Sequence, residues 1–264
     1  MASPYKPRLA LLVTDTPLPA IVDTLGAYPN IFKTWLLASA FANVDVVLDE
    51  YDTLAGQLPS DPDAYDGMII TGSKHSAYDD TPWIKQLIEF IARVARDHTR
   101  VKIIGICFGH QIIAQALGGP TATVSNPAGW EPGVYTVALT SMGKRIFGAE
   151  SIDIQQMHRD HVPAVPQGTI GLGSSQKCPV QGLVKLYHNV PEGEEIDLSK
   201  DVQIFSVQGH PEFTGFIVET VVRARGATGA MDPSTVQDGL ERAHRPHDGH
   251  TLIGHAVWKV LGLH

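Results

Sequence analysis

A seven-residue stretch in the middle of the chain, GICFGHQ at residues 105–111, constrains the fold more than any other feature. An apolar run at 101–104 precedes it, and a helix-like run at 111–117 follows it. Strand, sharp turn and helix form the context that holds a nucleophile on a strained turn. Two glycines flank Cys107 and leave room for strand and helix to approach each other. The helix N-terminus favours a thiolate, and the N–H of Phe108 is placed to donate to an oxyanion, so the stretch predicts a catalytic thiol.

A second stretch about a hundred residues later supplies the partners that a thiol nucleophile needs. The run 202–208 predicts a strand, and Gly209-His210-Pro211-Glu212 follows it. In extended backbone His210 and Glu212 point to the same side, with Cα atoms roughly 7 Å apart. Pro211 restricts the backbone between them. We therefore predict Cys107 as nucleophile, His210 as base and Glu212 as the group that orients the base.

Together these stretches resemble the class I, or triad, glutamine amidotransferases, in particular a stand-alone group similar to the glutaminase domain of GMP synthase. Shorter pieces match the same family in order: ITGS at 70–73, EPG at 131–133, HRD at 158–160 and CPVQ at 178–181. The paired catalytic stretches are specific, whereas the shorter pieces are weak singly. The resemblance covers roughly residues 8–220.

The resemblance also implies further site residues. Those that it assigns to an oxyanion hole are Gly72, Ser73 and Phe108. Those that it assigns to binding of the substrate amino acid are Gln111, Met157 and His158, the last two through backbone groups. Simpler readings stay open: a strand end for Gly72 and Ser73, a polar residue at a helix N-terminus for Gln111, and an ordinary turn histidine for His158. Glu131 fits the family's strand entry or an exposed strand-end glutamate equally well.

Composition narrows the class of partner. The net charge is −8 and no basic stripe occurs, which argues against a nucleic acid or an anionic membrane as partner. The two cysteines, Cys107 and Cys178, cannot form a disulfide framework, and we interpret Cys178 as a packed core thiol. A free thiol nucleophile requires a reducing compartment, and no apolar run has the length of a signal peptide or membrane span. These features predict a cytoplasmic protein.

Alternating strand and helix patterns predict the fold. Strands are expected at 9–14, 44–48, 65–72, 101–106 and 202–208, and helices at 30–41, 83–96, 111–117, 214–225 and 251–261. Short strands at 121–124, 133–139 and 152–157 indicate an antiparallel extension, and 182–188 would pair beside the last strand. Loops are expected at 49–63, 191–200 and 226–249. The pattern and the resemblance agree on one domain over 1–264, a flavodoxin-like three-layer α/β/α sandwich with a mostly parallel sheet.

Other chemistries fit the sequence less well. His244, His247 and His250 follow no metal-ligand spacing, and Pro246 and Gly249 interrupt the helix that would align them, so we predict no metal and no cofactor. A cysteine hydrolase of the α/β-hydrolase type would place an acid, Asp160 or Asp201, before the histidine and would leave Glu212 unexplained. The DJ-1-like fold often has histidine directly after the cysteine, where this chain has Phe108.

We therefore predict hydrolysis of a γ-glutamyl amide bond through a thioester on Cys107. About 50 residues follow Glu212 and no G-x-x-x-x-G-K-[ST] loop occurs, so no synthetase part is expected in this chain. Three hypotheses stay open: a glutaminase subunit that delivers ammonia to a separate synthetase, a γ-glutamyl peptidase acting on a substrate such as a glutathione conjugate, and a non-catalytic binding module. For the peptidase, segments 49–63 and 75–82 are the expected walls of the leaving-group side.

Overall fold

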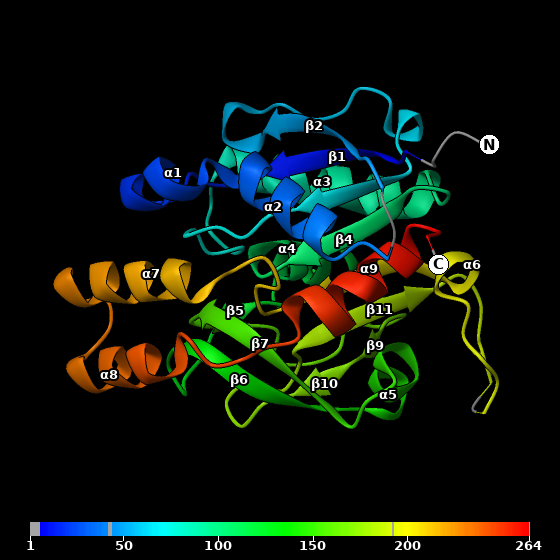
Figure 1. Ribbon diagram of the computed structural model, residues 1–264. Coiled ribbons are helices and arrows are strands. Elements are labelled where there is room, and N and C mark those ends of the chain that lie inside the picture. The colour runs from blue at the N-terminus through cyan, green and yellow to red at the C-terminus, as the bar shows by residue number, and fades with distance from the viewer. Residues whose placement is uncertain (1–5, 42–43, 192, 264) are drawn as a thin grey trace.

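A seven-stranded sheet forms the centre of the protein (Figure 1). The computed structural model describes residues 6–41, 44–191 and 193–263. In spatial order the strands are β2 (Val47–Asp52), β1 (Arg8–Val13), β3 (Gly67–Ile70), β4 (Lys102–Ile106), β12 (Val202–Val207), β11 (Gly182–Leu186) and β9 (Ile170–Gly171). The first five are parallel, β11 is antiparallel to β12, and β9 is antiparallel to β11. The mostly parallel sheet and the pairing of segment 182–188 beside the last strand are as predicted.

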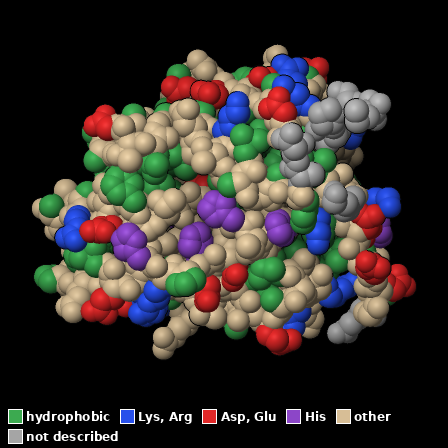
Figure 2. Space-filling model, viewed as in Figure 1, with side chains coloured by type: hydrophobic (Ala, Val, Ile, Leu, Met, Phe, Trp, Pro, Cys, Tyr) green, Lys and Arg blue, Asp and Glu red, His purple; other side chains and the backbone are tan. Residues whose placement is uncertain are grey.

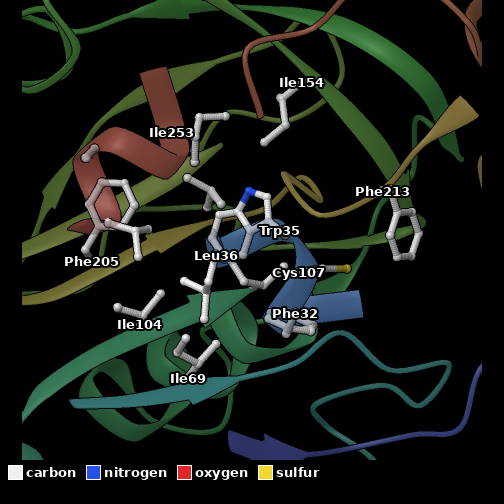
Figure 3. Packing of buried hydrophobic residues seen from close by; sticks show 14 of the residues in the cluster. Phe32, Trp35, Leu36, Ile69, Ile104, Cys107, Ile154, Phe205, Phe213 and Ile253 are labelled. Carbon is white, nitrogen blue, oxygen red and sulfur yellow. The ribbon is translucent and has the colours of Figure 1, made fainter. Parts of the chain in front are cut away.

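Helices cover both faces of this sheet, because its central strands are apolar on both sides. Leu9 and Leu11 of β1 belong to one buried cluster, and Ala10 and Leu12 belong to the other. On the first face pack α2 (Tyr28–Ala38) and α9 (Gly254–Val260), and on the second pack α3 (Pro82–Asp97) and α4 (Phe108–Gly118). Figure 3 shows Trp35 of α2 lying between the sheet and the segment that carries Ile253. The α/β/α sandwich of the flavodoxin-like type is confirmed.

The antiparallel extension is also present. A three-stranded sheet has the order β10 (Gly173–Ser174), β6 (Glu131–Leu139) and β7 (Ser151–His158). A two-stranded ladder joins β5 (Val124–Ser125) to β8 (Asp160–His161). A short helix that the sequence pattern does not reveal, α5 (Ser141–Phe147), lies between β6 and β7 in the chain and begins with a Thr140 side-chain cap.

The second strand begins three residues later than predicted, and the loop expected at 49–63 starts correspondingly too early. Arg8 pairs with Val47 in the parallel ladder, and Arg8 Nε donates to Asp49 Oδ2 at 2.8 Å. Strand β2 lies at the sheet edge, where only one neighbour has to be matched and acidic side chains stay solvated. The polar run at 49–52 was therefore wrongly predicted to be loop. Two short 3₁₀ turns, η1 (Thr53–Ala55) and η2 (Pro62–Ala64), occupy part of the rest.

The polar segment 226–249 is not a continuous loop. It contains α8 (Pro233–Arg242), whose N-terminus is capped by Asp232 Oδ1 accepting from the backbone N–H of Ser234 at 3.0 Å. The helix packs on β6, where the Tyr135 hydroxyl donates to Asp238 Oδ2 at 2.9 Å. The sequence pattern does not predict α8, because the helix has no wide apolar stripe. Tertiary contacts and the Asp232 cap stabilise it instead.

The remaining elements complete the chain and frame the active-site edge. They are α1 (Pro19–Leu25), α6 (Leu198–Asp201), α7 (Gly215–Ala227) and the π-helical turn η3 (Gly249–Ile253) that leads into α9. The carboxyl ends of β1, β3, β4 and β12 meet at one edge, the position where parallel α/β sheets carry their sites. Among the residues that the structure describes, no helix is long and apolar enough to cross a membrane.

Candidate active site

Cys107 lies on a strained turn between β4 and α4. Its φ is +51°, and within the described ranges it is the only residue other than glycine with a positive φ. The turn can form because the first helical turn passes very close to β3. A Cβ on Gly109 would lie 2.4 Å from the carbonyl oxygen of Ile70, so only glycine fits there. The strain therefore lies at the sulfur-bearing residue, as expected for a nucleophile elbow.

His210 and Glu212 are buried beside this turn and bonded to each other. His210 Nδ1 and Glu212 Oε1 are 2.8 Å apart, and the imidazole stacks on the Phe213 ring with centroids 3.9 Å apart. Burial disfavours a charged imidazole, but the charges of Cys107 and Glu212 and hydrogen bonds to both outweigh it and raise the pKa of His210. The structure thus brings together the three residues that the sequence predicts as nucleophile, base and orienting group.

Gly72 is part of the same packing. A Cβ at this position would lie 2.5 Å from Cε1 of His210, so the imidazole rests directly on the backbone that follows β3. We expect Gly72→Ala to displace the ring and to lower kcat/KM for γ-glutamyl hydrolysis by about 100-fold, the effect of a misplacement of about 1 Å. The measurement is steady-state release of glutamate by the purified variant.

A matched control separates this effect from a general cost of replacing glycine. Gly171 lies in β9, and a new methyl there would meet only the end of the Val165 side chain, at 2.9 Å. Gly171→Ala should keep kcat/KM close to wild type. If Gly72→Ala also did so, the imidazole would not depend on Gly72 for its position.

The Cys107 sulfur has a further polar neighbour that the sequence analysis does not single out. Gln208 is fully buried, and its Nε2 donates to Cys107 Sγ at 3.6 Å. Gln208 Oε1 accepts from Gln111 Nε2 at 3.2 Å, and the same Gln111 amide donates to the carbonyl oxygen of Asp160 at 2.9 Å. The one sequence feature that could have indicated a role for Gln208 is its position, as a polar amide directly after the apolar strand β12. Gln111 faces the elbow, as predicted.

The groups predicted for an oxyanion hole lie around the same sulfur-bearing turn. Phe108 is the first residue of α4, where backbone N–H groups have no partner within the helix. Gly72 and Ser73 follow β3, and Ser73 Oγ donates to the carbonyl oxygen of Thr14 at 2.8 Å. In the part of the chain that the structure describes, no hydrogen bond occupies the backbone N–H of Gly72 or Ser73. These N–H groups are therefore available for an oxygen of a substrate.

A cavity of about 130 Å³ opens above Cys107 and includes Gln111, Met157 and His158 in its lining. The predicted substrate-binding residues are thus brought to one place. Of the predicted leaving-group walls, His75 and Ser76 line this cavity. Segment 49–63 lines neither this cavity nor the larger one beside it, so its expected role as a wall is wrong.

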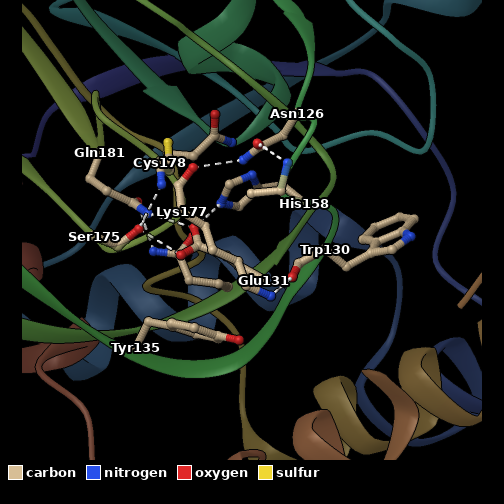
Figure 4. Close-up of polar contacts among 12 residues, drawn as sticks. Asn126, Trp130, Glu131, Tyr135, His158, Ser175, Lys177, Cys178 and Gln181 are labelled. Atoms are coloured by element: carbon tan, nitrogen blue, oxygen red, sulfur yellow. Dashed lines mark hydrogen bonds and ion pairs between the residues drawn. The ribbon is translucent and has the colours of Figure 1, made fainter. Parts of the chain in front are cut away.

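Glu131 is fully buried, so it is not an exposed glutamate at a strand end. Its carboxylate contacts the His158 side chain (Figure 4). Glu131 Oε2 lies 3.0 Å from His158 Nε2, and Glu131 also accepts from Ser175 Oγ at 2.6 Å and from Gln181 Nε2 at 2.9 Å. Burial alone raises the pKa of a carboxyl, but hydrogen bonds and charge from His158, with the Ser175 hydroxyl, lower the pKa of Glu131. The contact with Glu131 thereby fixes the side chain of His158 at the wall of the smaller cavity.

We expect Glu131→Gln to lower the free energy of unfolding by about 1–3 kcal/mol, because the buried partners lose their charged acceptor. Since folding lowers the pKa of Glu131, its stabilising contribution is complete above the ordinary carboxyl pKa of about 4.3 and is lost as the pH falls through the lower folded value. Urea denaturation at several pH values measures both effects. The loss of stability on acidification should be smaller in the variant than in the wild type.

The matched control for this prediction is Glu150→Gln. The Glu150 side chain is 85% exposed and pairs with Lys144 at the surface, so its replacement should change stability by no more than about 0.5 kcal/mol. Equal losses in Glu131→Gln and Glu150→Gln would contradict a structural role for the buried carboxylate.

Several side chains of the types that bind metal ions contact other groups of the protein. Ligand atoms of Glu131, His158 and Cys178 lie within 4.8 Å of one another. The Cys178 thiol donates to the carbonyl oxygen of Val180 at 3.5 Å, and burial raises its pKa to about 12, as expected for a packed core thiol. His244 Nε2 lies 2.9 Å from Glu219 Oε2. The His247 and His250 rings lie with their centroids 6.3 Å apart, and Figure 2 shows histidines in a row across the middle of this face.

The family model described as Glutamine amidotransferase class-I matches residues 30–217, a span that includes Cys107, His210 and Glu212. The chain belongs to this family. Relatives of this chain include a glutamine amidotransferase-like protein of Schizosaccharomyces pombe, 35% identical over 93% of this chain and 95% of that protein. Gamma-glutamyl peptidase 3 of Arabidopsis thaliana is 30% identical over 82% of this chain and 81% of its own length.

A solved structure supports the fold of this family member. A glutamine amidotransferase from Thermotoga maritima superposes with a TM-score of 0.68 over 97% of this chain and 98% of that chain, at 20% identity. The family identifies the protein as an amidotransferase-like enzyme.

Proposed function

We propose that the protein hydrolyses the amide bond of a γ-glutamyl compound through a γ-glutamyl thioester on Cys107. The observation that carries the proposal is the buried His210–Glu212 pair hydrogen-bonded beside a cysteine on a strained strand-to-helix turn. Nucleophile, base and orienting acid in mutual contact are the arrangement that acyl transfer requires.

The reaction follows from these positions. His210 takes the proton of the Cys107 thiol, and the sulfur attacks the γ-carbonyl carbon. The carbonyl oxygen becomes an oxyanion, which the N–H groups of Phe108 and of Gly72 or Ser73 stabilise. The protonated His210 then gives its proton to the leaving nitrogen as the C–N bond breaks. Water attacks the thioester with His210 as base, and glutamate and the free thiol are released.

Glu212 orients the imidazole and stabilises its positive charge in each of these steps. Gln208 donates a hydrogen bond to Cys107 Sγ and so helps to hold the sulfur in position. The γ-glutamyl group itself would occupy the cavity above Cys107, with Gln111 and the backbone of Met157 and His158 around its amino-acid end. The thiolate chemistry requires reducing surroundings, so we place the protein in the cytoplasm.

The substrate is glutamine or a γ-glutamyl peptide or glutathione conjugate, and the relatives named gamma-glutamyl peptidase favour the peptide. A glutaminase subunit that passes ammonia to a separate synthetase is the second candidate, favoured by the amidotransferase family itself. A non-catalytic binding module would not need the Cys107, His210 and Glu212 constellation, which argues against that third candidate.

The test is a release assay with the purified protein alone. Glutamine, glutathione and S-hexylglutathione are compared for glutamate production at equal concentrations. We expect the γ-glutamyl peptides to be hydrolysed at least as fast as glutamine. A protein that is inert on all three, yet releases ammonia from glutamine when a synthetase partner is added, would be a glutaminase subunit instead.

A further inference from the structure

A second cavity, of about 240 Å³, adjoins the first one on the other side of the catalytic centre. His210 lines this larger cavity, whereas Cys107 lines the smaller one. Four residues line both: Ser73, Lys74, Met157 and Arg225. The larger cavity lies between α1 and α7, which contact each other at the active-site edge (Figure 1). The nucleophile and its base therefore face two different, adjoining cavities.

The chemistry of the proposed reaction assigns the two cavities to the two halves of the substrate. The acyl carbon bonds to Cys107, so the γ-glutamyl group occupies the side of the sulfur. The proton that His210 carries goes to the leaving nitrogen, so the leaving group must lie on the side of the imidazole. Of the two cavities, His210 lines the larger one. This cavity is consequently on the leaving-group side.

The cavity is far larger than ammonia needs, and much of its wall is apolar. A molecule of that size needs only about 10–15 Å³ of such space. Its walls are formed by Leu18 and Ile21 at the start of the α1 region and by Ile217, Val221 and Ala224 on one face of α7. Positions four and then three residues apart on a helix line one face, so α7 presents a continuous apolar wall. Such a wall binds an apolar substituent by removing it from water.

A cation lies where the two cavities join. Arg225 is half-buried, and its Nε is enclosed without a hydrogen-bond partner. Its guanidinium carbon lies 4.6 Å from the centre of the Trp130 ring, and no carboxylate within the described ranges forms an ion pair with it. Lys74 differs, because Asp15 neutralises it at 2.7 Å. A partly desolvated guanidinium that has no anionic partner is suited to bind a carboxylate of a ligand.

We propose that the larger cavity binds the leaving group of an apolar γ-glutamyl peptide conjugate. The apolar substituent packs against Leu18, Ile217 and Val221, and the carboxylate of the leaving peptide binds Arg225. This inference rests on the proposed γ-glutamyl hydrolysis and names its substrate class: a γ-glutamyl peptide with a bulky apolar substituent and a free carboxylate on the leaving side. The bonds made and broken are those of the thioester route, with water as the only co-reactant.

The first test narrows the cavity. Ala224→Leu puts three more carbons into the wall formed by α7, and Ala227→Leu makes the same change at an exposed position of the same helix outside the cavity. We expect Ala224→Leu to lower the ratio of kcat/KM for S-hexylglutathione to that for glutamine by at least about 10-fold, and Ala227→Leu to keep it. An unchanged ratio in Ala224→Leu would overturn the proposal. If Ala224→Leu does not fold, Leu18→Gln replaces it as the test. Leu18 is a partly exposed residue of the cavity wall, and its replacement by a polar side chain should lower the same ratio.

The second test concerns Arg225. γ-Glutamylhexylamide has an apolar leaving group without a carboxylate, whereas S-hexylglutathione has both. Arg225→Gln should raise KM for S-hexylglutathione by at least about 10-fold and should change KM for the hexylamide much less. Equal losses for the two compounds and for glutamine would place Arg225 on the γ-glutamyl carboxylate and overturn this assignment.

A binding measurement separates failure of the cavity proposal from failure of the proposed hydrolysis. Calorimetry of S-hexylglutathione with Cys107→Ala, and with Cys107→Ala combined with Ala224→Leu, needs no turnover. At least about 10-fold weaker binding in the double variant supports the cavity even if the wild type proves inert as a hydrolase. Equal affinities overturn the cavity proposal even if the wild type cleaves glutamine.

Discussion

Replacing Cys107 by alanine is expected to lower γ-glutamyl hydrolysis by roughly 10,000-fold or more, because no other group can form the thioester. The side chain is small and lies where the core meets the cavities, so the fold should survive. Mass spectrometry supplies a second measurement. A brief reaction of the wild type with substrate followed by acid should show a γ-glutamyl adduct that is absent from Cys107→Ala.

The other cysteine is the control. The Cys178 thiol is fully buried and bonded to the Val180 carbonyl, and burial raises its pKa to about 12. A neutral, enclosed thiol is a poor nucleophile, so Cys178→Ala should keep kcat near the wild-type value and lower only stability, by about 1 kcal/mol. Wild-type turnover in Cys107→Ala would exclude the thioester route.

The features that could be predicted from the sequence are those with a local cause. The elbow at Cys107 follows from two glycines between a strand pattern and a helix pattern, and its φ of +51° is the strain that such a turn implies. The contact between His210 and Glu212 follows from their spacing around a proline. The apolar runs of β1, β4 and β12 required a sheet covered on both faces. Each of these depends on residues within a few positions of one another.

The features that escaped prediction depend on tertiary placement. Residues 53–63 follow β2 at the active-site edge, but β1 and β3 separate β2 from β4, so this part of the predicted wall lies about 14 Å away across the sheet. Sequence order could not show that β2 would be the outermost strand. Gln208 and Arg225 have ordinary local surroundings in the sequence, and only the packing of α7 against the active-site edge brings Arg225 to the two cavities. The polar helix α8 depends likewise on its contacts with β6.

The catalytic base provides the second prediction with a large effect. His210→Ala should lower kcat/KM by at least about 1,000-fold, because both the removal of the thiol proton and the protonation of the leaving nitrogen lose their carrier. Glu212→Ala should cost less, since the imidazole stays and loses only orientation and charge support. Steady-state kinetics with glutathione and glutamine measures both variants, and Glu219→Ala, which removes a half-buried glutamate on α7 that lines neither cavity, is the control.

The pH dependence distinguishes a positioning role of Glu212 from a merely structural one. The charge of Glu212 helps to raise the pKa of His210, so its removal lets that pKa fall. Because the protonated imidazole must protonate the leaving nitrogen, the alkaline limb of kcat/KM should move to lower pH in Glu212→Ala. Glu212→Gln keeps the shape of the side chain without its charge and should show the same shift with smaller loss of stability. If the limb stays in place in both variants while kcat/KM falls, Glu212 acts through packing alone. If His210→Ala keeps its rate, a base other than His210 activates Cys107.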